Sequence, residues 1–84
     1  MKKADLTKLE KNELISLMQL PNHLRETMLA LIALGEATAR DVSNETGKAR
    51  ASESDHLNQL ERMRFLKKRR AGRTVYYTRI KQNA

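Results

Sequence analysis

The sequence predicts a small, mainly α-helical domain that ends in a single β-hairpin. Up to residue 64, apolar side chains recur at helical spacing, and capping and turn residues divide this part into four helices. From Phe65 onward the period changes, and β-favouring residues alternate with basic ones on both sides of Ala71-Gly72. Eighty-four residues suffice for one domain with a modest core.

The first predicted helix begins at Thr7 and Glu10, which have the Thr-x-x-Glu spacing of a capping box. It runs to about Leu20, because Pro21 biases the residue before it away from helical angles. This helix has more apolar side chains than packing against so small a body requires. They are Leu6, Leu9, Ile15, Leu17, Met18 and Leu20. Either core packing or a dimer interface explains the excess.

The middle of the chain predicts a buried helix followed by a short one. Asn22 is a suitable N-cap for the buried helix and Gly35 a suitable end. Its apolar stripe has helical spacing and comprises Leu24, Met28, Leu31 and Ile32. Thr38, with Asp41 three residues later, then caps a helix of about two turns that Gly47 ends.

A longer helix is predicted over residues 49–64. Its start is open between Ala49, which is a poor cap, and Ser52, about one turn later. The side chains expected to face inward are Leu57, Leu60 and Met63. After this helix the hairpin follows, with strands predicted over residues 65–70 and 74–78 and a basic tip.

The formal net charge of +7 arises wholly from the C-terminal end of the chain. Nine lysines and arginines follow Glu61 and no acidic residue does, whereas residues 1–61 contain eight bases and ten acids. Apolar and aromatic residues are interleaved with these bases, so the hairpin carries the charge as a folded element. A surface of one sign on a folded element predicts a polyanionic partner.

The sequence also argues against several classes of protein. It has no cysteine, and therefore neither a disulfide framework nor a thiolate nucleophile. No apolar run follows its basic start, so we do not expect that start to be a signal peptide. The longest apolar run, residues 28–34, is too short to span a bilayer, so we expect a cytoplasmic protein. No serine has a motif that would activate it, which predicts a non-enzyme. His23 and His56 are far apart in sequence, so no metal or other cofactor is expected, and His56 is expected to be a half-buried structural residue.

The order of helix, short helix, glycine turn, longer helix and basic hairpin is that of a winged helix-turn-helix, preceded here by an extra N-terminal helix. Residues 39–47, 54–61 and 65–77 resemble the ArsR-type and MarR-type winged-helix transcription regulators. We therefore expect an N-terminal helix over residues 1–22, for dimerisation or core packing, and a DNA-binding domain over residues 23–84. The resemblance implies a homodimer that binds double-stranded DNA and regulates transcription.

In this family the helix after the glycine turn enters the major groove, and the hairpin contacts the backbone or the minor groove. The resemblance implies ten candidate DNA contacts: Thr38, Arg40, Lys48, Arg50, Ser54, Asn58, Lys68, Arg69, Arg70 and Arg73. Arg50 is suited to guanine, and Asn58 to adenine or a phosphate. The alternatives are a solvated surface for Arg50, Ser54 and Asn58, a plain helix cap for Thr38, and for the hairpin arginines a charged edge that discourages aggregation.

Some positions depart from the family pattern. Glu53 replaces an apolar residue, Ala49 replaces a capping serine or threonine, and Asp55 replaces a basic residue or histidine. Together with Glu61, the two acidic replacements favour an alternative function, a winged-helix module for protein interaction within a larger assembly. A second alternative is non-specific nucleoid or RNA binding, because the charge lies in the hairpin rather than on the reading helix.

Overall fold

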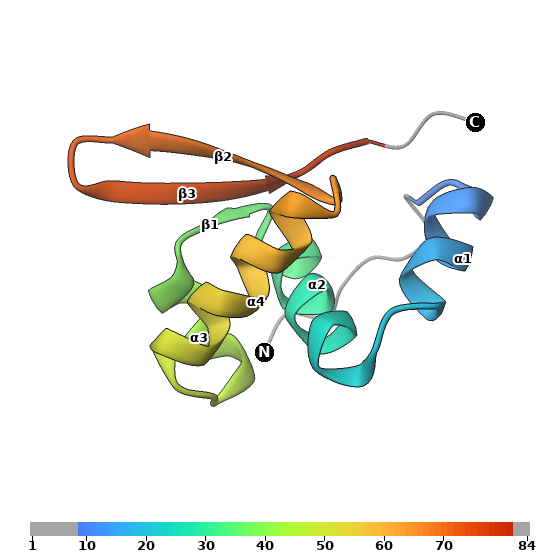
Figure 1. Cartoon of the computed structure of the whole chain (residues 1–84), viewed down its shortest axis with the longest axis horizontal. Helices are drawn as coiled ribbons and strands as arrows, with labels where there is room; N and C mark the ends of the chain where they lie inside the picture. The colour runs from blue at the N-terminus through green and yellow to red at the C-terminus, as the bar shows by residue number, and fades with distance from the viewer. Residues whose placement is uncertain (1–8, 82–84) are drawn as a thin grey trace.

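A computed structural model of the chain describes residues 9–81. Its elements are α1 (Lys11–Met18), α2 (Asn22–Leu34), β1 (Glu36–Ala37), α3 (Ala39–Thr46), α4 (Arg50–Arg62), β2 (Leu66–Ala71) and β3 (Thr74–Arg79). Helices α2, α3 and α4 gather on one side of a three-stranded antiparallel sheet, and the β2–β3 hairpin extends beyond them (Figure 1). This is the predicted winged helix-turn-helix with an extra N-terminal helix.

The core is built mainly from leucines, because the chain has few aromatic residues to fill it. Its largest fully buried hydrophobic side chains are those of Leu24, Leu31, Val42, Leu57, Leu60 and Leu66. Burial of one such side chain contributes about 1.5–3 kcal/mol to stability. Helix α2 is the central helix, as predicted, and α3 and α4 pack against it.

Helix α1 begins later than the sequence predicts. Residues 9 and 10 are not helical, and the first helical residue is Lys11. The Glu10 backbone N–H donates to Oε1 of Glu13 at 2.9 Å, which satisfies a donor that the helix leaves open. Thr7, the predicted cap, lies outside the described residues.

Three further predictions about helix boundaries and faces are decided by the structure. The N-cap of α2 is Pro21 rather than Asn22, which is already helical. The N-cap of α4 is Ala49, so the alternative start at Ser52 is wrong. Met63, predicted to face inward, follows the last residue of α4 and is 44 % exposed. The inward set on this helix therefore contains only its leucines and one acidic residue, described below.

The caps of α3 follow the prediction. The Thr38 hydroxyl accepts from the Asp41 N–H, and the Thr38 N–H donates to the Asp41 carboxylate, both at 3.1 Å. Gly47 closes the helix with φ = 77°, a left-handed conformation that favours glycine. The short helix and the turn toward α4 are therefore fixed by three local residues.

The sheet contains one strand that the sequence does not predict. β1 has two residues, Glu36 and Ala37, which pair with Thr78 and Tyr77 of β3. Two residues are too few for an alternating pattern to be visible. The predicted hairpin is confirmed, and a two-residue loop connects its strands. Gly72 occupies the first position of that loop with φ = 62°, as a type II′ turn requires.

Helix α1 packs on the body through one side only. Leu17 in the helix and Leu20 after it are buried. Ile15 and Met18 are 49 % and 68 % exposed, so the apolar excess predicted for this region belongs partly to the core and partly to the surface. Figure 1 shows α1 at the opposite end of the molecule from the hairpin turn.

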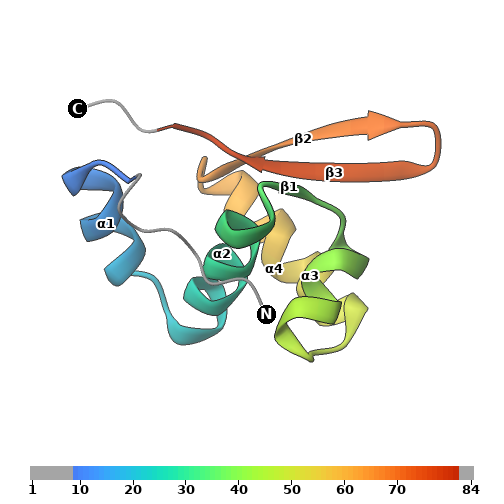
Figure 2. The ribbon, with the colours of Figure 1, turned by 180° about the vertical axis from the view of Figure 1, so that it is seen from behind.

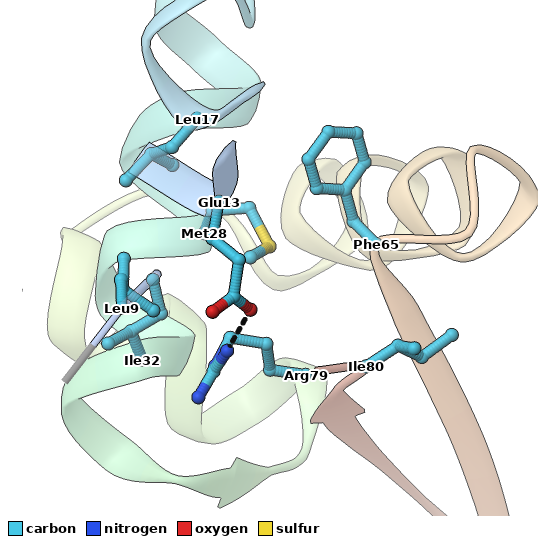
Figure 3. A pocket seen from close by; sticks show the side chains of 8 residues that line it. All are labelled: Leu9, Glu13, Leu17, Met28, Ile32, Phe65, Arg79 and Ile80. Atoms are coloured by element: carbon cyan, nitrogen blue, oxygen red, sulfur yellow. Dashed lines mark hydrogen bonds and ion pairs between the residues drawn. The ribbon is translucent and has the colours of Figure 1, made fainter. Parts of the chain in front are cut away.

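An ion pair joins α1 to the end of the sheet. Arg79, the last residue of β3, donates to the carboxylate of Glu13, a buried residue of α1. Figure 3 shows this pair at the edge of an apolar cavity lined by residues that include Leu9, Met28 and Ile32. The cavity holds about 20 Å³, roughly the space of one water molecule. Among residues 9–81, this cavity is too small for a ligand larger than water.

A fully buried carboxylate connects the three helices of the helix-turn-helix. Glu53 lies in the first turn of α4 and is 0 % exposed. Its Oε1 accepts from Thr27 of α2 at 2.7 Å, and its Oε2 accepts from Thr46 of α3 at 2.6 Å. Nδ1 of His56 lies 2.7 Å from Oε1. Burial alone would raise the pKa of Glu53, but the hydrogen bonds from Thr46, Thr27 and His56 lower it below 4.5.

We predict that Glu53→Gln lowers the free energy of unfolding by about 1–3 kcal/mol at neutral pH, because the amide has one acceptor oxygen where the threonines need two. A carboxyl group with a lowered folded-state pKa stabilises the fold above its unfolded pKa, and this stability is lost as pH falls through the folded pKa. The native chain should therefore lose stability below pH 4.5, and the variant should lose less. Thermal unfolding across this pH range measures both effects; equal pH dependence in the two proteins would contradict the assignment.

Candidate nucleic-acid interface

An open groove of about 670 Å³ separates the helix-turn-helix from the β2–β3 hairpin, which we call the wing. Eight of the ten predicted contacts line it: Thr38, Arg40, Arg50, Ser54, Asn58, Lys68, Arg70 and Arg73. They come from the N-terminal ends of α3 and α4, the middle of α4, and the distal half of the wing. Figure 2 shows the wing turn projecting past α3. The structure therefore brings together residues up to 35 positions apart in the chain.

The groove is strongly cationic. Its lining includes Arg40, Arg50, Lys68, Arg70 and Arg73, and none of its described lining residues is a carboxylate. Asp55, which replaces a basic residue or histidine of the family pattern, is exposed but does not line the groove. Two helix N-termini, those of α3 and α4, add partial positive charge on the same side. An anionic partner would therefore meet attraction across the whole groove.

Strand alternation determines which wing bases face the groove. Lys68 and Arg70 are two residues apart, so both point to the same side of β2. Opposite them in the register stand Tyr77 and Val75, which also line the groove. Neither residue is among the ten predicted contacts, although the same alternation would have placed them beside Lys68 and Arg70.

Two predicted contacts lie outside the groove. Arg69 is on the other side of the wing, where its guanidinium is 3.0 Å from the Glu36 carboxylate and 4.7 Å from the ring centroid of Tyr76. Its hydrogen bond lowers the pKa of Glu36. The Lys48 ammonium is 2.6 Å from the carboxylate of Glu26 on α2. Both pairs are exposed and contribute little to stability.

No family model matches this chain. An uncharacterized protein of Archaeoglobus fulgidus is 43 % identical over 58 residues, which are 69 % of this chain and 78 % of that protein. The two proteins belong to one family.

Three solved structures are similar to this chain over most of its length. The AntR antimony-specific transcriptional repressor has a TM-score of 0.66 at 27 % identity, covering 84 % of this chain and 66 % of AntR. NolR from Sinorhizobium fredii has a TM-score of 0.57 at 27 % identity, covering 81 % of this chain and 66 % of NolR. HlyU from Vibrio cholerae has a TM-score of 0.61 at 26 % identity, covering 84 % of this chain and 80 % of HlyU. The chain thus spans slightly less than two thirds of AntR and NolR.

This chain has the fold of the winged-helix regulators of the ArsR/MarR type. Its structural neighbours are transcription regulators and not enzymes. For a winged-helix regulator the reading helix is the second helix of the helix-turn-helix, which in this chain is α4. The groove thus lies between the expected reading helix and the wing.

A hydrogen bond across the groove floor connects α4, the expected reading helix, to the wing. The Tyr77 hydroxyl donates to Oδ1 of Asn58 at 2.9 Å. Burial of Tyr77, with a smaller contribution from Glu61, raises the pKa of its hydroxyl above 10.0. Asn58 is therefore positioned by the wing as well as by its own helix. Its oxygen is already used, which limits how it can pair with adenine or a phosphate.

The two histidines, far apart in sequence, meet in this fold. The ring centroids of His23 on α2 and His56 on α4 are 5.0 Å apart. His56 is half-buried, as predicted, with Nδ1 against Glu53. Within residues 9–81 no group of three or more metal-binding side chains forms a site. Over the same residues, no helix is long and apolar enough to cross a membrane.

We predict that Tyr77→Phe lowers the free energy of unfolding by about 0.5–1.5 kcal/mol, because the Asn58 oxygen loses its donor. The variant should also lose one tyrosine titration above pH 10.0 in an alkaline absorbance titration. Tyr76→Phe serves as the control, since it removes one phenol and leaves the bond to Asn58 intact. If both variants lost the same stability, the hydrogen bond would not be what holds Asn58.

Proposed function

We propose that this chain binds double-stranded DNA with sequence specificity and acts as a transcription regulator. The observation that carries the proposal is the groove, where five cations and two helix N-termini converge on one side of the molecule. In this arrangement α4 enters the major groove, and the wing lies on the backbone or in the adjacent minor groove. The AntR repressor, with the same fold, supports this assignment.

The residues of the groove divide into two roles. Arg50 is exposed at the first position of α4, where a bidentate guanidinium can pair with guanine O6 and N7. Arg70 and Arg73 flank the wing tip and neutralise phosphates without reading sequence. Thr38 and Arg40 at the start of α3 add a further backbone contact. Lys48 and Arg69 can contact the DNA only if a phosphate replaces their carboxylate partners, Glu26 and Glu36.

The structure bears on the protein-interaction alternative. That function relied on Glu53, Asp55 and Glu61 as an acidic face of the reading helix, but Glu53 is fully buried. Only Asp55 and Glu61 remain at the surface of α4, too few for an acidic docking face. The alternative of non-specific nucleoid or RNA binding is still supported by the charge of the wing, because three of the five groove cations belong to it.

Gel-shift titration against random and genomic duplexes tests the proposed function. Tight binding to a subset of genomic duplexes is the expected result. Equal affinity for all duplexes would support a non-specific architectural protein instead. Absence of binding at low salt would support the interaction module.

The two roles predict two different mutant phenotypes. Arg70→Ala with Arg73→Ala should weaken binding to every duplex and lower the slope of log K against log salt by about 0.9 per lost phosphate contact. Arg50→Ala should change the preference among duplexes by about 1–3 kcal/mol at the base pair it contacts. Fluorescence anisotropy at several salt concentrations separates the effects. An equal loss of affinity for every duplex in the Arg50 variant would mean that Arg50 contacts the DNA backbone rather than a base.

We further propose that the regulator is a cytoplasmic homodimer that pairs through α1. The supporting observation is the exposure of Ile15 and Met18 on a helix whose other side packs on the core. Two-fold symmetry would place the reading helices about 34–36 Å apart, on half-sites about one turn of DNA apart.

Ile15→Glu with Met18→Glu should therefore yield monomers, because two carboxylates cannot be buried unpaired in an interface. Sedimentation equilibrium measures the mass, and circular dichroism checks the fold. Gln19→Glu, an exposed neighbour that leaves the apolar pair intact, is the control. If the native chain itself were a monomer, α1 would not be a dimer interface.

A further inference from the structure

The groove leaves part of the positive charge of the chain unexplained. Nine bases follow Glu61. Three of them, Lys68, Arg70 and Arg73, line the groove. The other six lie outside the groove: Arg62, Arg64, Lys67, Arg69, Arg79 and Lys81.

Three of these six, Arg62, Arg64 and Lys67, line a second open hollow at the base of the wing. Arg62 and Arg64 enter it from the C-terminal end of α4, and Lys67 enters it from the start of β2. The hollow measures about 670 Å³, the same as the groove. Glu61 is the sole carboxylate among its described lining residues. We call Arg62, Arg64 and Lys67 the wing-base surface.

The chain reverses sharply to bring these bases together. After α4 ends at Arg62, Arg64 adopts φ = 66°, which is uncommon for a residue with a side chain. The N–H groups of Arg64 and Phe65 donate to the carbonyls of Glu61 and Leu60, both at 3.0 Å, which closes the helix end. The strand β2 therefore starts beside the last turn of α4.

The wing-base surface is continuous with the groove. Lys68 lines both hollows, because it lies on β2 between the tip and the base of the wing. A basic surface thus extends from Arg73 at the tip, past Lys68, to Arg62 at the end of α4. A polyanion held in the groove needs no break in contact to continue onto the wing base.

We propose that the wing-base surface binds phosphates of the DNA that flanks the segment held in the groove. This inference rests on the proposed function. Two of the described lining residues are apolar, the buried Leu66 and the half-buried Ile80, and they stand beside four bases. Four bases against one carboxylate suit contact with the DNA backbone without sequence reading.

The test compares a short duplex, about 10 bp, with one of about 30 bp that has the same centre. Arg62→Gln and Lys67→Gln are measured singly and together, and Lys11→Gln on α1 is the control with the same change in net charge. On the long duplex each of the two variants should lower the salt slope by about 0.9, and the double variant by about twice that. On the short duplex the slopes should match the native slope.

Each outcome has one meaning. Changes confined to the long duplex support the wing-base surface. Changes as small as that of Lys11→Gln on both duplexes overturn it, and so do changes of equal size on both. Failure of the native chain to bind either duplex would overturn the proposed function itself. Thermal unfolding of each variant, with unchanged Tm expected at these exposed positions, verifies that the fold is intact.

Discussion

The hydrogen bonds of the buried Glu53 carboxylate fix the angle between α3 and α4, the two helices on which the proposed function depends. The two oxygens connect the end of α3, the middle of α2 and the first turn of α4. A hydrophobic side chain in that position would pack with less directional preference, because dispersion contacts depend weakly on angle. With one donor on α2 and one on α3, a single orientation of α4 satisfies both carboxylate oxygens, and the exposed side of α4 is thereby set. The groove residues on α4 take their places from a residue that no partner can touch.

The sequence predicted those parts of the fold that local chemistry determines. The caps of α3 and the hairpin turn follow from Thr38, Gly47 and Gly72, whose roles depend on neighbours within a few residues. The two-residue β1 and the exposure of Met63 depend on how distant segments pack, which no local pattern records. The site shows the same division. Eight predicted contacts converge, whereas Lys48 and Arg69 are engaged by acids 22 and 33 positions away.

Glu53 shows most clearly why a sequence pattern can mislead. As an acidic residue on the reading helix it suggested a surface feature, since carboxylates are seldom buried. Its burial becomes favourable only because Thr27, Thr46 and His56 surround it, and these lie on three different helices. The departure from the family pattern is thus an internal replacement. It removes an argument against DNA binding, because that charge never faces a phosphate.

The bond between Tyr77 and Asn58 has a mechanical consequence for a bound duplex. It connects the middle of the wing to the middle of α4, so it opposes any movement of the wing away from α4. The distance between α4 and the wing is therefore held nearly constant, and the duplex has to supply the matching groove width. DNA sequences whose groove already has that width would bind with less distortion, even at base pairs that no side chain contacts.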